Sequence, residues 1–438
     1  MLKITFMGAG STVFAKNVLG DCMLTQALRE CEISLYDIDS TRLEESWQML
    51  SAINANCNQN KAIINKYLGR ENRKAALRGA DFVVDAIQVG GYEPSTVIDF
   101  EIPKKFGLRQ TIGDTLGIGG IFRALRTIPV LEEFARDMEE VCPDAWFLNY
   151  VNPMAMLTGY MQRYTGIKTV GLCHSVQVCS EMLLKSLDME QTGFSDKIAG
   201  INHMAWLLEI KDSKGNDLYP EIRKRAAEKN LAEKHTDMVR FEYIRRLGYY
   251  CTESSEHNSE YNMFFIKSKY PELIEKYNIP LDEYPRRCVK QIEDWETRHD
   301  SLIQNPELTH ERTREYASYI MESMVLNQPY KIGGNILNNG VIENLPRDAC
   351  VEVPCLVDGS GIKPCYMGRL PVQLAAMNMT NINVQLLTIE AAVTKKREHI
   401  YQAAMMDPHT ASELSLDDIV KLCDALIEAH GDYLPKYR

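Results

Sequence analysis

The chain has 438 residues, of which 45% are hydrophobic and 25% are charged, and this composition is typical of a globular protein of about two domains. The formal net charge of −11 makes a polyanion a poor partner, so we expect no nucleic-acid binding. No apolar run approaches the roughly 20 residues of a membrane span, and no signal peptide is recognisable, so we expect a cytoplasmic protein without membrane contact.

The first predicted elements form a nucleotide-binding unit. A short apolar strand at 3–7 leads into a Gly-Ala-Gly turn, which is followed by a helix-like segment at 12–28. A second apolar run at 33–36 ends in Asp37. In this order the glycines let the backbone approach a pyrophosphate, the helix N-terminus faces its charge, and the carboxylate holds the ribose hydroxyls. Asp37 favours NAD over NADP, because a 2′-phosphate would meet a negative charge there.

The glycine fingerprint is incomplete, because Val13 stands where a third glycine is usual. A bare structural turn is therefore the alternative interpretation. The strand, helix, strand and acid in register favour nucleotide binding. The residues expected to contact the cofactor are Gly8, Gly10, Ser11, Thr12 and Asp37.

The rest of the first half continues to alternate strands and helices. Buried strands are predicted at 80–87, 145–150 and 169–173, and the apolar positions of 128–141 recur at helical spacing. This alternation predicts an α/β fold with a Rossmann-like, doubly wound parallel sheet. In such sheets ligands bind beyond the carboxyl ends of the strands. The segments expected there are 88–91, 149–153 and 173–175.

The second half has a different pattern, and we expect two domains: an NAD-binding domain at 1–195 and an α+β domain at 196–438. The second domain is expected to carry catalytic, metal-binding and oligomerisation functions. Apolar runs near its start predict an antiparallel strand pair, and a Gly/Asn-rich patch at 333–340 predicts a turn between strands. Helices are predicted at 221–247, 285–299, 373–400 and 416–430.

The twelve cysteines contain no Cys-x-x-Cys pair, so a zinc ribbon or a thioredoxin-like motif is not supported. In a cytosolic chain most such cysteines are small core side chains. At least one of them has a different role, which the following motifs indicate.

Four short motifs carry a family resemblance. They are Asn-Tyr-Val-Asn-Pro-Met at 149–154, Gly-Leu-Cys-His-Ser at 171–175, Gly-Ile-Asn-His-Met-Ala-Trp at 200–206 and Glu-Ser-Ser-Glu-His at 253–257. With these motifs the chain resembles glycoside hydrolase family 4, the NAD- and manganese-dependent glycosidases, from residue 2 to about residue 435. It is most similar to the α-galactosidase (melibiase) branch. The resemblance also implies a fold like that of the lactate and malate dehydrogenases.

The resemblance implies an unusual route to hydrolysis. NAD removes hydride from C3 of the sugar, and the resulting ketone acidifies the C2 proton. A base removes that proton, the C1 glycosidic bond breaks by elimination, water adds, and NADH reduces C3 again. This family is an exception to the two-carboxylate mechanism of glycosidases. A divalent ion, expected to be Mn²⁺, stabilises the charge that develops at O2 and O3.

The same resemblance assigns roles to individual residues. Cys173 and His203 are the implied metal ligands. Tyr261 is the implied C2 base, and its phenol needs a neighbouring cation to lower its pKa from about 10. His174 occupies the position where other branches carry an aspartate that protonates the leaving group. It is either that acid or a residue that orients the metal ligands by a hydrogen bond.

The resemblance also implies contacts with the substrate. Asn152 is expected to bind a sugar hydroxyl, and Arg287, rather than its neighbour Arg286, is expected to contact the substrate. Relatives that cleave phosphosugars carry an arginine where this chain has Thr96, so a free sugar is favoured. An α-galactoside is the first choice, and an α-glucoside or an α-galacturonide is the alternative.

Two other classes of protein remain as alternatives. A sugar or hydroxy-acid dehydrogenase would use NAD without manganese and would accumulate NADH. A nucleotide-sensing binding protein would have no use for Tyr261 or for the metal pair. The resemblance also implies a homodimer or homotetramer.

Overall fold

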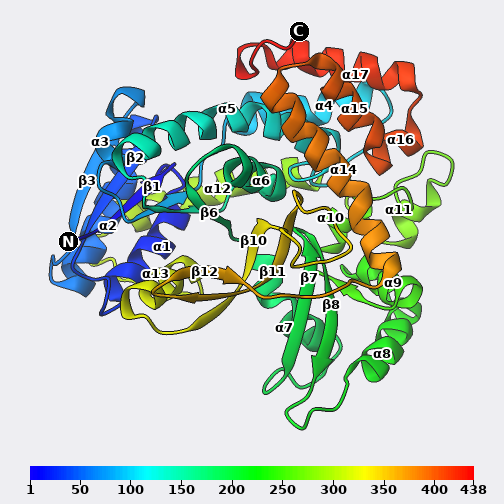
Figure 1. Ribbon diagram of the computed structural model, residues 1–438, viewed down its shortest axis with the longest axis horizontal. Helices are drawn as coiled ribbons and strands as arrows, with labels where there is room; N and C mark the ends of the chain where they lie inside the picture. Colours follow the sequence, from blue (N-terminus) through cyan, green and yellow to red (C-terminus); the bar gives the residue numbers. More distant parts are fainter.

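The computed structural model describes residues 1–438, and its central feature is one 12-stranded sheet (Figure 1). The strand order is β3-β2-β1-β4-β5-β6-β10-β11-β7-β8-β9, and β12 pairs with β11. The strands are β1 (Leu2–Met7), β2 (Cys31–Asp37), β3 (Ile63–Leu68), β4 (Phe82–Asp85), β5 (Trp146–Asn149), β6 (Lys168–Gly171), β7 (Ser195–Ile201), β8 (Met204–Lys211), β9 (Tyr250–Cys251), β10 (Tyr330–Leu337), β11 (Cys350–Asp358) and β12 (Gly361–Pro364).

The first six strands of this order are parallel. Ile4 of β1 lies opposite Ile33 of β2 on one side and opposite Phe82 of β4 on the other. The order β3-β2-β1-β4-β5-β6 is that of the doubly wound dinucleotide-binding fold. The predicted α/β fold with a Rossmann-like parallel sheet is therefore confirmed.

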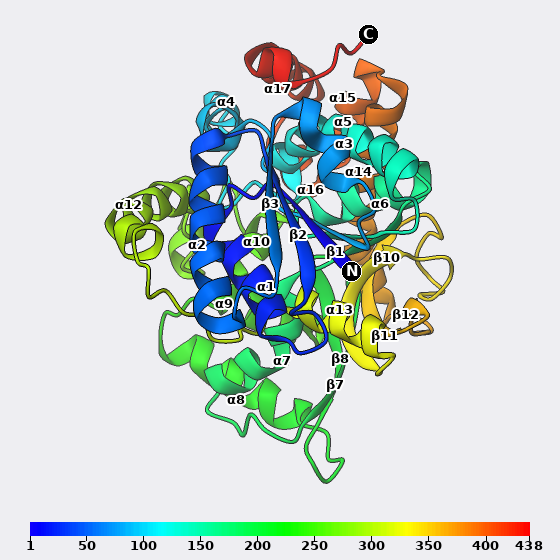
Figure 2. The ribbon, with the colours of Figure 1, turned by 90° about the vertical axis from the view of Figure 1, so that its left-hand side faces the viewer.

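Helices cover both faces of the parallel strands. Figure 2 shows α2 on one side of β1–β3 and α3 and α5 on the other. The helices are α1 (Thr12–Leu24), α2 (Ser40–Asn58), α3 (Arg73–Leu77), α4 (Val97–Lys105), α5 (Gly117–Val141), α6 (Met154–Tyr164), α7 (His174–Ser186), α8 (Tyr219–Ala232), α9 (Met238–Leu247), α10 (Ser255–Glu260), α11 (Glu272–Lys276), α12 (Glu283–Ile303), α13 (Tyr316–Leu326), α14 (Val372–Thr394), α15 (Arg397–Met406), α16 (Pro408–Glu413) and α17 (Leu416–His430). None of them is long and apolar enough to cross a membrane.

The two halves of the chain share one hydrophobic core. Phe6 of β1, Phe147 of β5, Val353 of β11 and Ile382 of α14 are all buried in it. The antiparallel strands β10, β11, β7 and β8 extend the parallel sheet beyond β6 without a break. The proposed domain boundary between residues 195 and 196 therefore falls within β7, inside a continuous sheet.

Some elements of the structure differ from the predictions, among them the predicted helix at 373–400, which is divided between α14 and α15. β3 was not predicted, because it is an edge strand with a half-exposed, partly polar sequence. Gly333 and Gly334 lie within β10 rather than in a turn. The glycine at 333 is explained by close packing, because a Cβ there would lie 2.6 Å from the Val176 side chain of α7. The predicted helix at 221–247 is two helices, because the buried carboxylate of Asp237 binds Arg240, Tyr250 and Ser255 where the chain turns.

All twelve cysteines are free thiols, and all but Cys57 and Cys365 are buried. This agrees with the expectation that most of them are core side chains. It leaves Cys173 to be considered with the site.

Asp85 at the end of β4 gives a prediction about pH. Its carboxyl group is completely buried without a side-chain partner, and burial raises its pKa to about 8. From about pH 4 to 8 the folded chain holds a proton that the unfolded chain has released, so the free energy of unfolding falls as pH rises. We expect Asp85→Asn to remove this pH dependence of the free energy of unfolding, which is on the order of a few kcal/mol.

The measurement is the thermal unfolding midpoint of the wild type and of Asp85→Asn at pH 5 and pH 8. The wild type should lose more stability between the two pH values than the variant does. Equal losses in both proteins would contradict the prediction.

Candidate active site

The turn between β1 and α1 has the geometry of a pyrophosphate site. Gly8 has a φ of +84°, and a Cβ there would lie 2.8 Å from the carbonyl group of Ala86, which follows β4. Only glycine fits this position. Ser11 is the N-cap residue of α1, but no side chain caps the helix, so its first N–H groups are free to bind an anion. Thr12 is buried at the first turn, and its Oγ1 donates to the Gly10 carbonyl over 3.2 Å.

Asp37 at the end of β2 lies against the same turn. The Gly10 N–H donates to Asp37 Oδ2 over 2.6 Å, and a Cβ at Gly10 would lie 2.9 Å from that oxygen. Val13 is 42% exposed on α1, so the missing third glycine causes no clash inside the fold. The five residues predicted to contact NAD thus surround one turn, and the donor set fits a dinucleotide.

We expect Asp37→Ser to weaken NAD binding roughly 10-fold and to narrow the preference for NAD over NADP, because hydrogen bonds to a charged group are worth about 1.5–3 kcal/mol. Dissociation constants of NAD and NADP, measured by protein fluorescence, check this. Asp39→Ser is the matched control, since that carboxylate caps α2 through the N–H groups of Thr41 and Arg42. A variant that keeps the wild-type ratio of the two constants would refute the assignment.

The implied metal ligands converge with a third residue. Cys173 follows β6, His203 lies in the turn between β7 and β8, and Glu253 follows β9. One ligand atom from each lies within 4.8 Å of the others. We call these three residues the metal cluster. A thiolate, an imidazole and a carboxylate are the donor types that bind divalent transition metals, so the residues present fit a divalent ion.

Burial and neighbouring charges shift all three groups. Burial raises the pKa of the Cys173 thiol, so its thiolate needs a nearby cation. Burial also lowers the pKa of His203 to about 4 and keeps the ring neutral. Burial works to raise the pKa of Glu253, but His257 and His203 outweigh it and lower that pKa to about 2. At neutral pH the cluster therefore offers a neutral imidazole and an ionised carboxylate.

Tyr261 contacts the metal cluster directly. Its hydroxyl lies 3.0 Å from Nδ1 of His203, and the side chain is completely buried. Burial raises the pKa of this phenol well above its usual value. A phenolate at this position therefore requires a cation beside it, which is the condition stated for Tyr261 from the sequence. The Asn381 amide donates to the Tyr261 carbonyl over 3.0 Å and helps to fix the residue.

The loop beside Tyr261 is held by Glu260. The buried carboxylate accepts N–H groups of Thr111 and Gly113 over 2.7 Å each, and that of Ile112 over 3.3 Å. Burial nevertheless raises its pKa to about 7. The three hydrogen bonds join the end of α10 to the loop that precedes α5.

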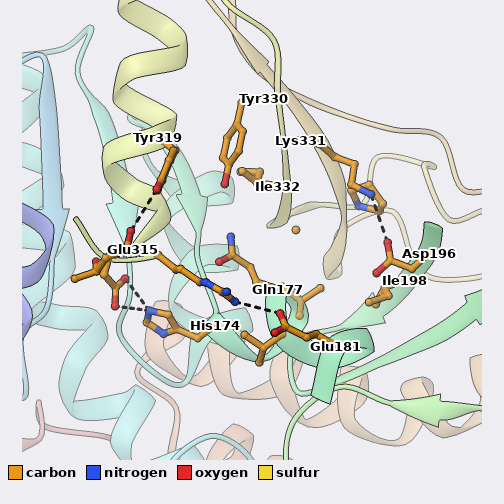
Figure 3. Close-up of a pocket in the computed structure, with 16 residues that line it drawn as sticks. His174, Gln177, Glu181, Asp196, Ile198, Glu315, Tyr319, Tyr330, Lys331 and Ile332 are labelled. Carbon is orange, nitrogen blue, oxygen red and sulfur yellow. Dashed lines mark hydrogen bonds and ion pairs between the residues drawn. The ribbon is translucent and has the colours of Figure 1, made fainter. Parts of the chain in front are cut away.

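His174 is the first residue of α7, and its ring faces Glu315 (Figure 3). Its Nε2 lies 2.7 and 2.9 Å from the two oxygens of Glu315. This hydrogen bond raises the pKa of His174, so the ring holds a proton more readily than a free imidazole. The ring also packs beside Phe14 of α1 and Tyr150, which places it near the dinucleotide turn.

A cavity of about 460 Å³ opens beside His174 (Figure 3). Two ion pairs cross its walls: Glu181 with Arg314 at 3.1 Å and Asp196 with Lys331 at 3.4 Å. The residues of the metal cluster do not line it. Among the implied site residues, His174 is the one that lines this cavity.

The implied substrate residues lie just after β5 and in the first turns of α12. Asn152 follows β5, and its Oδ1 is buried without a hydrogen-bond partner. Arg287 of α12 reaches Glu256, one residue before His257, with its Nη2 3.1 Å from Oε1. Both arginines bind Glu283, and Arg286 also donates to the Leu281 carbonyl. Of the two, Arg287 is the one that contacts the segment at 253–257.

Several polar residues of this region were not predicted as site residues from the sequence. His257 Nδ1 lies 3.5 Å from Glu253 Oε1, and His257 Nε2 lies 3.8 Å from Asp114. Arg123 is 8% exposed and has no carboxylate within ion-pair distance; its Nη1 donates to the Tyr284 hydroxyl over 3.3 Å. The motif at 253–257 was the one signal in the sequence that could have indicated Glu253 and His257.

The position of Thr96 agrees with a site for an unphosphorylated sugar. Thr96 is buried, and its hydroxyl donates to the Gly91 carbonyl over 3.2 Å. Arg126 touches the same loop at the Val89 carbonyl, but Asp99 neutralises it through two hydrogen bonds. Neither residue offers a free positive charge to a phosphate.

The glycines at the start of α5 serve the packing of the chain itself. A Cβ at Gly119 would lie 2.2 Å from the Gly113 carbonyl oxygen, and one at Gly120 would lie 2.6 Å from Thr115. Close backbone packing therefore explains both glycines.

Comparisons with known proteins agree with these features. Residues 3–189 match the model of "Family 4 glycosyl hydrolase", and residues 198–410 match that of the "Family 4 glycosyl hydrolase C-terminal domain". The chain is 64% identical to an alpha-galactosidase of Bacillus subtilis over 100% of both chains. It is 31% identical to an alpha-galactosidase of Rhizobium meliloti, over 99% of this chain and 89% of that one.

A solved structure has the same fold. It is a 6-phospho-alpha-glucosidase from gut microorganisms in complex with NAD and Mn²⁺, with a TM-score of 0.81 and 20% identity over 100% of both chains. At this identity the likeness concerns the fold alone.

Proposed function

The chain belongs to the family 4 glycosyl hydrolases and is a glycoside hydrolase, and from this premise we propose that it cleaves α-galactosides with NAD and a divalent ion, Mn²⁺. The route proceeds by oxidation at C3, removal of the C2 proton, elimination of the C1 substituent, addition of water and reduction at C3. The observation that carries the proposal is the cluster of Cys173, His203 and Tyr261 at the carboxyl ends of the sheet. The 64% identity to an alpha-galactosidase over the whole chain supports the choice of sugar.

The cofactors divide the chemistry between them. When bound, NAD supplies the acceptor and later the donor of the C3 hydride, and the divalent ion supplies positive charge beside O2 and O3. NAD would be held by the turn of Gly8, Gly10, Ser11 and Thr12 and by Asp37. The metal would be held by Cys173 and His203.

The protein side chains move two protons. Tyr261, as phenolate, accepts the proton from C2 of the oxidised sugar. Nδ1 of His203, which lies beside the phenol oxygen, stabilises the phenolate. His174, held by Glu315, donates a proton to the glycosidic oxygen as the C1 bond breaks. Asn152 and Arg287 are proposed to bind sugar hydroxyls.

The test uses metal-free and NAD-free protein under reducing conditions. Release of p-nitrophenol from p-nitrophenyl α-galactoside is measured with NAD and Mn²⁺ added singly and together. Cleavage only with both present is the expected result. Cleavage of another α-glycoside alone would change the sugar, and steady accumulation of NADH without cleavage would favour a dehydrogenase.

We also propose a homodimer or homotetramer that acts in the cytoplasm. The reducing compartment suits a metal site that depends on the free thiol of Cys173. Size-exclusion chromatography with light scattering tests the oligomeric state.

A further inference from the structure

The carboxylate of Glu253 occupies a position that the metal pair alone leaves unexplained. Its Oε2 lies 3.3 Å from Nε2 of His203, and the cluster of ligand atoms includes Sγ of Cys173. The three residues come from three separate segments: the end of β6, the turn between β7 and β8, and the residues after β9. Such convergence of different donor types in space is characteristic of a metal site.

The two oxygens of Glu253 have different surroundings. Oε1 accepts the Ser254 N–H over 2.9 Å and lies 3.5 Å from Nδ1 of His257. Oε2 faces His203, and no lysine or arginine lies within ion-pair distance of the carboxylate. One oxygen is therefore held by the protein, while the other faces His203 and has no permanent positive partner.

The imidazole of His203 is arranged in the same sense. Its Nδ1 is engaged with the Tyr261 hydroxyl at 3.0 Å, so Nε2 is the nitrogen that faces Glu253. With Nδ1 engaged, Nε2 is the ring nitrogen left to bind an ion, and it lies beside the carboxylate.

The backbone supports a shared function for these two residues. His203 has a φ of +63° and Glu253 a φ of +60°, a conformation that is uncommon for residues other than glycine. Such backbone strain destabilises the fold and clusters at ligand sites. Here the strain aims two side chains at one point.

We propose that Glu253 is a third protein ligand of the divalent ion, beside Cys173 and His203. This inference rests on the proposed function, which supplies the ion. A thiolate and an imidazole alone suit softer metals, whereas Mn²⁺ favours oxygen donors such as carboxylates. Three protein ligands also leave positions in an octahedral shell for two sugar oxygens.

The test measures metal binding rather than activity. Metal-free protein is titrated with Mn²⁺, and the free ion is followed by its electron paramagnetic resonance signal. We expect Glu253→Gln to weaken Mn²⁺ binding at least about 10-fold, because even the outer partners of metal ligands contribute 10–100-fold. Glu413→Gln, which removes a carboxylate that pairs with Lys267, is the control for the change in charge.

A second variant separates a ligand from a structural residue. Glu253→Gly relieves the left-handed backbone, since glycine adopts positive φ without steric cost. We expect its thermal unfolding midpoint without metal to equal or exceed that of the wild type, while its Mn²⁺ affinity falls as in Glu253→Gln. A purely structural role for the side chain predicts the opposite pattern, with lower stability and unchanged affinity.

The outcomes also distinguish this inference from the proposed function. Wild type that binds Mn²⁺, Cys173→Ser that does not, and Glu253→Gln that binds like wild type would overturn the role of Glu253 alone. Wild type that binds no Mn²⁺ would overturn both the metal dependence and this inference.

Discussion

Replacement of Cys173 with serine is expected to lower kcat/KM for p-nitrophenyl α-galactoside by at least about 10³-fold, because a bound metal ion contributes several kcal/mol to transition-state stabilisation. The serine hydroxyl does not ionise at neutral pH, so the variant lacks the thiolate. Cys173 is 8% exposed, and burial already raises the pKa of its thiol. The thiolate and the ion therefore depend on each other. Initial rates at saturating NAD, over a wide range of Mn²⁺ concentrations, are the measurement.

The control for Cys173→Ser is Cys179→Ser, which makes the same chemical change within α7, the helix that Cys173 directly precedes. Cys179 is buried in the small core between α7 and the strands β7 and β8. We expect this control to keep its Mn²⁺-dependent activity. Retention of activity by Cys173→Ser, at Mn²⁺ concentrations where the wild type is saturated, would remove Cys173 from the proposed site.

The same argument predicts how metal binding depends on pH. A thiol must lose its proton to bind a metal, so Mn²⁺ binding releases a proton and weakens as pH falls. Oxidation of Cys173 by peroxide would also remove the ligand. We expect peroxide to abolish activity in the absence of a reductant and metal to slow that loss.

The parallel half of the fold was predictable because its strands are continuous apolar runs. Residues 82–85 and 146–149 are almost entirely buried, and such strands stand out in the sequence. β3 lacks this signal because it is a half-exposed edge strand. Likewise, no local pattern announces that β10 and β11 enter the sheet between β6 and β7.

The site was predictable only where a motif marks it. Cys173 and His203 were named from family motifs, and the turns that carry them belong to different parts of the sheet. Glu253 reaches them because the two-residue strand β9 pairs with β8, so that Cys251 lies opposite Trp206. Glu315 is 141 positions from His174, and only the packing of the folded chain brings the two together. Periodicity carries no information about such contacts.

Replacement of Tyr261 with phenylalanine is expected to lower kcat by about 10²- to 10⁴-fold, which is the usual contribution of a general base. The phenyl ring keeps the packing of a buried side chain, while the oxygen 3.0 Å from His203 Nδ1 is lost. The binding of NAD should change little, because the proposed NAD site does not include the hydroxyl. The measurement is kcat for p-nitrophenyl α-galactoside, together with the isotope effect of deuterium at C2.

The isotope effect decides between a base and a packed aromatic side chain. If Tyr261 removes the C2 proton, Tyr261→Phe should make that step limiting and raise the C2 deuterium effect, and exchange of this proton with D₂O should slow by a similar factor. Tyr243→Phe is the matched control, since Tyr243 is also buried and its hydroxyl donates to the Asn258 carbonyl over 3.0 Å. Losing that bond should cost about 1 kcal/mol of stability and leave the exchange rate unchanged. Equal exchange in wild type and Tyr261→Phe would assign the proton transfer to another group.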